Sequence, residues 1–215
     1  MNRALLSLLS LALAAPLSRG LVFGQARIGS VARVSGIAFL QRDGKQSAVV
    51  PTMAVETNDR FGTRAKSSLI IDFIDGTELQ LGESSLITIE QRHASATGRR
   101  ASLLMLWNGK LRSIVKAVLA GAGDFEVHTP NAVAAVRGTD FETAFVQGKP
   151  CPEDHTCMRY TTVGVSSGKV AVSNPSTPAA SVLVTEGYET TVACESPPTS
   201  PAPLGMNEMG APGYH

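Results

Sequence analysis

Short runs of β-forming residues, each closed by a glycine-centred turn, recur along most of this chain. The turn pairs are Asp43-Gly44, Asp75-Gly76, Asn108-Gly109, Ser167-Gly168 and Glu186-Gly187. Asp-Gly and Asn-Gly are strong hairpin signals because a type I′ turn needs positive φ at both central residues. Strands at a spacing of ~8–12 residues predict a sandwich, barrel or solenoid rather than an α/β fold. We therefore expect an all-β domain of many short antiparallel strands, in a two-layer sandwich or solenoid-like arrangement.

The candidate strands differ in how their apolar residues are spaced. They are Ser30–Gln41, Ser47–Pro51, Ser68–Ile74, Glu78–Leu81, Ser85–Glu90, Arg100–Trp107, Lys110–Val115, Asp124–His128, Ala132–Val136, Asp140–Val146, Met158–Val165, Lys169–Ser173, Ser181–Thr185 and Tyr188–Ala193. In Ser85–Glu90, Ile87 and Ile89 alternate with the other residues, which predicts one face toward water. Ser68–Ile74 is apolar on both faces, which is typical of a central strand.

Residues 1–26 have the layout of a secretory signal peptide. Met1-Asn2-Arg3 is positively charged, Ala4–Ala15 is uncharged and rich in Leu and Ala, and Gly24-Gln25-Ala26 supplies the small residues of a cleavage site. A membrane anchor is the alternative, but the apolar run is shorter than the ~20 residues of a spanning helix. No later segment is long and apolar enough to span. We expect a periplasmic or secreted protein with no transmembrane segment in its mature chain, which begins at Arg27.

The rest of the chain divides into a folded domain and a tail. Residues 27–194 contain all the candidate strands and can bury enough surface to fold without staples. Residues 195–215 are rich in Pro, Gly, Ser and Met. This composition cannot fill a core, so we expect a disordered tail.

Charge argues against a polyanionic partner. Cleavage after Ala26 removes Arg3 and Arg19 and no acidic residue, so the formal net charge falls from +1 to −1. The only adjacent basic pair is Arg99-Arg100. Because phosphate binding needs clustered Lys and Arg, we do not expect the chain to bind nucleic acid.

The chain has three cysteines, Cys151, Cys157 and Cys194. In an oxidising compartment a disulfide is the default, and a Cys151–Cys157 bond would close a small loop, so we expect this pairing. A bond from either residue to Cys194 is the alternative. A metal site on Cys151, His155 and Cys157, with Glu153 or Asp154, is a weaker hypothesis, since its spacing matches no zinc motif and structural zinc needs four ligands. We expect no metal and no cofactor.

The segment Thr129–Phe141, TPNAVAAVRGTDF, resembles the signature of the FecR domain. Further segments resemble other elements of this family, in the family's order. They are Thr63–Leu81 with its Asp-Gly turn, Trp107–Leu111, Val165–Val172 and Val184–Val192. The resemblance spans about Gly29 to Cys194. It is interrupted at Gly148–Cys157, where family members often have a plain hairpin.

The resemblance implies an all-β periplasmic or extracellular module with a binding or scaffold role in the bacterial cell envelope. The best-known members are membrane-spanning regulators of sigma factors, in which this domain senses an outer-membrane receptor. Those proteins have a cytoplasmic helical segment and a spanning helix before the domain, whereas we expect only a cleavable signal here. The sigma-regulator role is therefore not expected to carry over, and the implied partner is an envelope protein.

Arg137-Gly138-Thr139, within the signature, joins the expected strands Ala132–Val136 and Asp140–Val146. Gly tolerates backbone angles that Arg and Thr do not, so the step is expected to be a structural corner. The alternative makes these residues a binding site, in which the Arg137 guanidinium holds a carboxylate or a strand-end carbonyl.

No motif indicates catalysis. Asp72, Asp75 and Glu78 could serve as paired carboxylates in a glycosidase, but Asp75 is a turn residue and Glu78 an exposed strand position. The chain has no GxSxG elbow, phosphate-binding loop, dinucleotide fingerprint or HExxH motif. We therefore expect a protein that is not an enzyme.

Two binding functions stay open. The first is a protein-interaction module that pairs an exposed strand edge with a partner. The second is a glycan- or peptidoglycan-binding module, which predicts exposed aromatic residues on one face. Trp107, Tyr160 and Tyr188 are the only Trp and Tyr residues before the tail, and this scarcity disfavours the glycan hypothesis.

Processing of the N-terminus can be measured directly. We expect the exported protein to begin at Arg27, because the small residues before it suit signal peptidase. Intact-mass spectrometry of protein recovered from the producing cells should give the mass of residues 27–215. A chain that retains residues 1–26 after export would contradict the cleavage.

Overall fold

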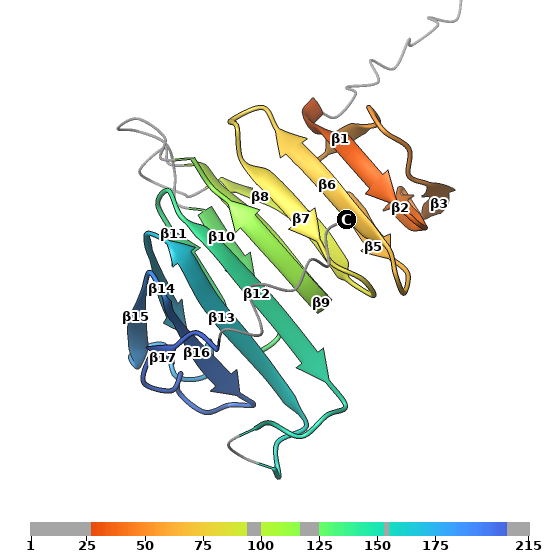
Figure 1. Ribbon diagram of the computed structural model, residues 1–215. Coiled ribbons are helices and arrows are strands. Elements are labelled where there is room, and N and C mark those ends of the chain that lie inside the picture. The colour runs from red at the N-terminus through yellow and green to blue at the C-terminus, as the bar shows by residue number, and fades with distance from the viewer. Residues whose placement is uncertain (1–26, 94–99, 117–124, 153–154, 206–215) are drawn as a thin grey trace, which may run out of the picture.

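The computed structural model describes residues 27–93, 100–116, 125–152 and 155–205 (Figure 1). Over these ranges the chain forms 17 strands and no helix, so the all-β prediction is confirmed. Within the same ranges, nothing helical has the length and hydropathy of a membrane span. The predicted signal peptide lies outside the described residues.

The strands are short except for β9. In chain order they are β1 (Arg27–Ser35), β2 (Ala38–Arg42), β3 (Lys45–Ala48), β4 (Ala54–Glu56), β5 (Arg60–Thr63), β6 (Ser68–Phe73), β7 (Glu78–Leu81), β8 (Leu86–His93), β9 (Arg100–Ile114), β10 (Phe125–His128), β11 (Val133–Val136), β12 (Asp140–Gln147), β13 (Arg159–Ser167), β14 (Lys169–Ser173), β15 (Ser181–Thr185), β16 (Tyr188–Ala193) and β17 (Ala202–Pro203).

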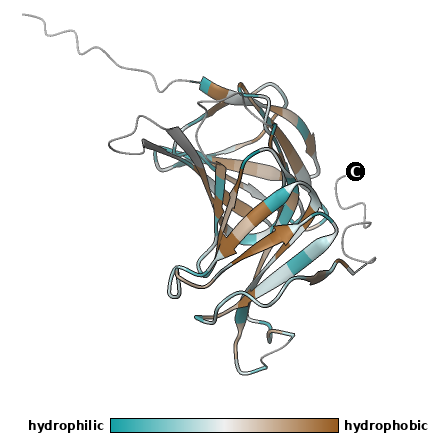
Figure 2. Cartoon of the chain, turned by 90° about the vertical axis from the view of Figure 1, so that its left-hand side faces the viewer, coloured by the Kyte–Doolittle hydropathy of each residue, from teal (hydrophilic) through white to brown (hydrophobic). Residues whose placement is uncertain are grey.

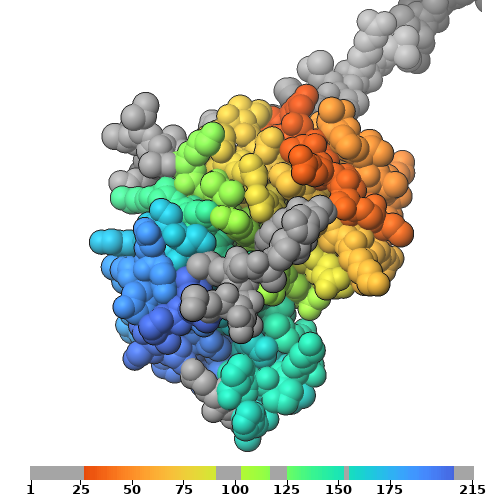
Figure 3. All heavy atoms as spheres, in the orientation of Figure 1, coloured from red at the N-terminus to blue at the C-terminus, as the bar shows by residue number. Residues whose placement is uncertain are grey.

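Backbone pairing arranges these strands in two layers. Sheet A has the order β4-β1-β6-β7-β9-β12-β13-β16-β17. Sheet B has the order β3-β2-β5-β8-β9-β10-β11-β14-β15. Among the described strands only β9 and β10 pair in parallel. Both sheets largely follow the chain order, so the domain extends from β1–β4 at one end to β14–β17 at the other (Figures 1 and 3).

Strand β9 belongs to both layers. Its first half pairs with β8 and β10 in sheet B, and its second half, from Gly109, pairs with β7 and β12 in sheet A. At the crossing Gly109 has φ +87°, and the register with β8 shifts between Leu86 and Ile87. The hairpin predicted at Asn108-Gly109 is therefore wrong. The positive φ bends one strand from sheet to sheet instead of reversing the chain.

The strands before β6 differ from the sequence prediction in two further ways. The predicted strand Ser30–Gln41 is divided into β1 in sheet A and β2 in sheet B, because Gly36 with φ +74° turns the chain between them. Strands β4 and β5 were not predicted. They are short and contain Glu56 and Arg60, so neither shows a clear apolar alternation.

The core fills the space between the sheets, as the alternating hydropathy along the strands shows (Figure 2). Ile87 and Ile89 of β8 are buried while Leu86 and Thr88 are partly exposed, which confirms the predicted alternation. Strand β6 lies between β1 and β7, as expected of a central strand. The largest fully buried side chains include Phe61, Phe141, Phe145, Leu69, Ile71, Leu79, Leu81, Ile87, Leu104, Leu106 and Leu111.

The chain stays on the domain beyond Cys194. Strand β17 pairs with β16, and the Thr190 hydroxyl donates to the Thr199 carbonyl at 2.7 Å. The Leu204 side chain packs against Gly164, where an added Cβ would come within 2.8 Å of Leu204 Cδ2. Residues 195–205 thus continue the folded structure, where the sequence predicted a disordered tail. The rest of that tail lies outside the described residues.

Gly109→Ala should destabilise the domain by about 3 kcal/mol or more, because it adds a steric clash to an unfavourable positive φ. An added Cβ would lie 2.3 Å from Ser85 Oγ and 2.6 Å from Ser85 Cα. The matched control is Gly187→Ala, since Gly187 has φ +81° but nothing within 4 Å of the added Cβ. It should cost only about 1–2 kcal/mol. Urea unfolding measures both, and equal losses would contradict a tight crossing.

Candidate functional site

The segment Thr129–Phe141 passes through both layers. Strands β10 and β11 form a hairpin in sheet B, and the chain then crosses to β12 in sheet A. The crossing is made by Arg137-Gly138-Thr139, the step at which the sequence predicted a structural corner between two strands. The segment is therefore one of the places where the chain passes from one sheet to the other.

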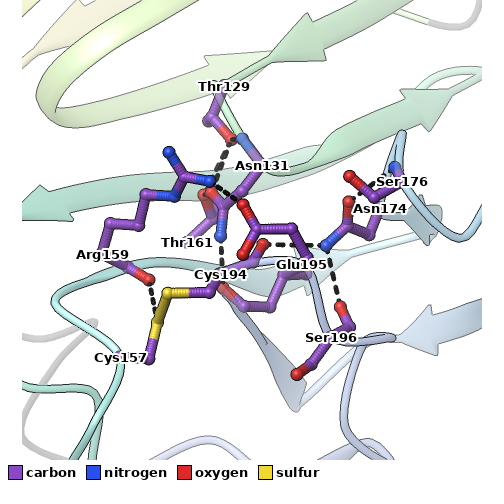
Figure 4. Close-up of polar contacts among 11 residues, drawn as sticks. Thr129, Asn131, Cys157, Arg159, Thr161, Asn174, Ser176, Cys194, Glu195 and Ser196 are labelled. Carbon is purple, nitrogen blue, oxygen red and sulfur yellow. Dashed lines mark hydrogen bonds and ion pairs between the residues drawn. A yellow bond between two sulfur atoms is a disulfide. The ribbon is translucent and has the colours of Figure 1, made fainter.

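The hairpin turn contains a buried polar cluster made of Thr129, Asn131 and Thr161 (Figure 4). The Thr129 backbone N–H donates to the Ala132 carbonyl at 2.8 Å, and its hydroxyl oxygen accepts from the Ala132 N–H at 2.9 Å. The Thr161 hydroxyl of β13 donates to Asn131 Oδ1 at 2.6 Å and lies 2.7 Å from the Thr129 hydroxyl. A turn in sheet B is thereby tied to a strand in sheet A.

Asn131 extends this connection to a third element. Its Nδ2 donates to the Val192 carbonyl of β16 at 2.7 Å. Asn131 is almost fully buried, and its amide is bonded through both oxygen and nitrogen. Buried amide groups that are fully paired fix a unique arrangement, whereas an unpaired one is costly. Asn131 therefore holds the relative position of the two sheets at this point.

At the crossing, the three residues predicted as a binding site have different environments. Thr139 is buried, exchanges backbone hydrogen bonds of 3.0 and 2.9 Å with Val115, and donates its hydroxyl to the Lys169 carbonyl at 3.1 Å. Gly138 has φ +74°, and Gly168 packs against its carbonyl. Arg137 is exposed. Gly138 and Thr139 thus contribute to the packing of the corner, and Arg137 has the most exposed position of the three.

The disulfide joins Cys157 to Cys194, with the two Cα atoms 5.9 Å apart. The predicted Cys151–Cys157 bond is therefore wrong, and Cys151 is a buried free thiol. The cause is the pairing of β13 with β16, in which Tyr160 lies opposite Ala193. This register places Cys157 and Cys194 at the same end of adjacent strands, although they are 37 residues apart.

Polar contacts anchor the chain on both sides of Cys194 (Figure 4). Arg159 forms an ion pair with Glu195. The Asn174 side-chain amide donates to the carbonyls of Cys194 and Ser196 at 2.9 and 2.8 Å. The loop after β14 and the segment after β16 are thus held together. Sequence reasoning missed Asn174, because nothing near it in the chain marks its distant partners.

The disulfide also weakens the metal hypothesis. Cys157 is not available as a thiolate ligand, and within the described residues no three His, Cys, Asp or Glu side chains gather closely enough to hold a metal ion. Glu153 and Asp154, the other ligands considered, lie outside those residues.

Asp75 is one of the carboxylates that were considered for catalysis. It accepts a hydrogen bond from the Thr77 N–H at 2.8 Å, so this carboxylate stabilises its own turn.

Residues 59–171 match the FecR protein family model, which covers more than half of the chain. The chain belongs to the FecR family. Its fold is also that of two crystal structures from Parabacteroides distasonis, solved at 2.50 and 1.65 Å and each described as a "putative anti-sigma factor". Both align with a TM-score of 0.51 and 17% identity, over 70% of this chain and 62% of the other. This FecR chain thus spans about 62% of their length. No curated protein matches it.

One edge of the FecR domain is apolar and unprotected. Strand β15 ends sheet B, and among the described strands it pairs only with β14. Its sequence, Ser181–Thr185, contains no charged residue and no proline, the features that usually protect an edge. Leu183 is 56% exposed, while its neighbour Val184 is fully buried.

The hydrogen-bond pattern shows which backbone groups of β15 face outward. The Glu186 N–H donates to the Gly168 carbonyl at 3.1 Å, one step beyond the pair Lys169–Thr185. Because bonded pairs alternate along an antiparallel ladder, the polar groups of Val182 and Val184 point toward β14. Those of Leu183 then point away from the sheet.

The disulfide assignment predicts a definite thiol count. In denaturant without reductant, iodoacetamide should modify Cys151 alone, and peptide mapping should link Cys157 to Cys194. Reduction should destabilise the FecR domain by about 4 kcal/mol, because it releases the loop between these cysteines. Cys151→Ala keeps the bond and should show the same sensitivity to reductant. Modification of Cys194 in the unreduced protein would contradict the pairing.

Proposed function

We propose that this FecR protein is a non-catalytic protein-interaction module of the bacterial cell envelope. It transmits a signal or holds an assembly by binding an envelope protein along strand β15. Family membership supports a signalling role, and the open apolar edge of β15 is the single observation that carries the binding mode.

An edge of this kind binds by strand addition. The outward N–H and C=O groups give main-chain hydrogen bonds to an extended segment, and side chains along the strand give specificity. Leu183 offers apolar contact beside the exposed backbone, and the absence of charge on β15 leaves no electrostatic barrier to an incoming strand.

We propose an exported location for the same protein. The Cys157–Cys194 disulfide supports it, because such bonds persist in the periplasm and outside the cell but are rare in the cytosol. The predicted signal peptide points the same way.

Glycan or peptidoglycan binding is the alternative. In the part of the chain that the structure describes, the exposed aromatic residues Trp107 and Tyr188 lie on different sheets, so they do not form one flat platform.

The test compares Leu183→Pro with Leu183→Ser in crosslinking and capture from the envelope fraction of the producing cells. Proline removes the outward N–H without touching a bond to β14, whereas serine removes only the apolar side chain. A stoichiometric envelope protein should be recovered with the native chain and the serine variant, and lost with the proline variant. Leu183→Lys is the substitute if the proline variant does not fold.

Three results would overturn the proposal: equal capture by the proline variant, no specific protein, or binding to peptidoglycan or a glycan array in place of a protein. Arg137→Gln, run in the same assay, tests the recognition role of that exposed side chain. Loss of capture by a folded Arg137→Gln protein would support the role, and unchanged capture would assign Arg137 to the corner alone.

A further inference from the structure

A second surface lies at the other end of sheet B, on its outward face. It combines exposed aliphatic side chains with two arginines that lie over aromatic rings. We call it the arginine–aromatic face and define it by Ile37, Phe39, Val50, Arg60, Arg64 and Trp107. Ile37 is 66% exposed, Val50 52% and Trp107 41%, so the face is apolar and open to solvent among the described residues.

The two arginines lie over the aromatic rings of the face. The Arg60 guanidinium lies 5.6 Å from the centre of the Trp107 ring, and that of Arg64 lies 5.4 Å from the centre of the Phe39 ring. Phe39 in turn covers Gly62, where an added Cβ would come within 2.2 Å of its ring. Trp107 is fixed by its Nε1 donating to the Thr88 hydroxyl at 2.9 Å. Both rings are thus immobilised beneath a cation.

Neither guanidinium has a carboxylate partner among the described residues. Arg60 Nε is buried without any hydrogen-bond partner there. The cross-strand neighbours of Arg60 are Gln41 and Thr88, and neither is acidic. Arg42, close by, differs: Asp59 binds it through two hydrogen bonds of 2.6 and 2.7 Å, which raises the pKa of Arg42.

On the outward face of sheet A, by contrast, cations are paired with carboxylates. Arg112 is bound by Asp140 through hydrogen bonds of 2.9 and 2.7 Å, and Lys110 lies 3.5 Å from Glu142. The arginine–aromatic face instead displays two positive charges and apolar surface, and within the described residues neither guanidinium forms an ion pair with a carboxylate. Its charge complement is a ligand that carries carboxylates and apolar groups together.

The occupant that fits is a peptide. Sugar recognition on a flat sheet uses open aromatic rings, but here guanidinium groups lie over both rings. The exposed aliphatic residues Ile37 and Val50 suit apolar side chains instead. A guanidinium over a ring can bind a carboxylate through paired hydrogen bonds from its two terminal nitrogens, even where Nε is buried as in Arg60.

We propose that the arginine–aromatic face binds an acidic, apolar segment of a partner protein, with its carboxylates on Arg60 and Arg64 and its apolar side chains on Ile37 and Val50. This site is separate from β15, which lies at the opposite end of the domain (Figure 1). The FecR domain then carries two binding surfaces. One, β15, binds the backbone of a partner, and the other binds carboxylates and apolar side chains.

The test uses a short synthetic peptide of alternating leucine and glutamate, its counterpart with glutamine in place of glutamate, and polygalacturonate as a carboxylated glycan. Trp107 is the only tryptophan of the chain, so its emission reports contact at this face. Anisotropy of dye-labelled peptide gives the affinity. The variant R60Q/R64Q removes both cations, and R33Q/K149Q removes two exposed charges elsewhere as the matched control.

We expect the glutamate peptide to change Trp107 emission saturably, with affinity that falls as salt rises. R60Q/R64Q should weaken binding by at least about tenfold, since each lost pair is a charge-assisted hydrogen bond. R33Q/K149Q and Leu183→Pro should bind as the native protein does. Retention in Leu183→Pro separates this face from β15, so either proposal can fail alone.

Four outcomes would overturn the inference. The glutamine peptide could bind as tightly as the glutamate peptide, or R33Q/K149Q could lose as much affinity as R60Q/R64Q. Polygalacturonate could bind where the peptide does not, which would make the occupant a glycan. Sedimentation could instead show self-association that R60Q/R64Q abolishes, which would make the occupant a second copy of this chain.

Discussion

The passage of β9 from one sheet to the other is the constraint on which the rest of the architecture depends. Two stacked sheets held only by side chains can slide, because apolar contacts have no direction. Strand β9 prevents this, since it is hydrogen bonded in sheet B up to Asn108 and in sheet A from Gly109. The register of β8, β10, β7 and β12 follows from this one strand.

The family signature adds another point at which the two sheets are fixed to each other. Asn131 ties the β10–β11 turn to β13 and β16 through satisfied buried hydrogen bonds, and Gly138 and Thr139 form the crossing from β11 to β12. The residues that identify the family therefore build the sandwich. The proposed binding surfaces lie toward its two ends. Strand β15, Ile37, Phe39 and Val50 are outside the matched range 59–171, whereas Arg60, Arg64 and Trp107 are inside it.

Sequence patterns predicted those features that depend only on neighbouring residues, such as strand positions and corners. Alternation located strands such as β8, and the corner at Gly138 followed from the backbone freedom of glycine. The Cys157–Cys194 bond depends on the pairing of β13 with β16, which no spacing reveals. Asn108-Gly109 has the sequence of a hairpin, and only the neighbouring strands decide that its positive φ serves a crossing. The two arginine–aromatic contacts likewise join distant residues: Arg60 of β5 with Trp107 of β9, and Arg64, just after β5, with Phe39 of β2.

The disulfide has a consequence for how the domain opens. It closes a loop that contains β13, β14, β15 and β16, so the two ends of this segment stay together when it opens and its unfolded states are restricted. At the other end β3 is exposed along its whole length and pairs only with β2 among the described strands. Amide hydrogen exchange should therefore begin around β2 and β3, beside the arginine–aromatic face. A ligand on that face would slow this exchange, so binding there would be coupled to the folding of one end of the domain.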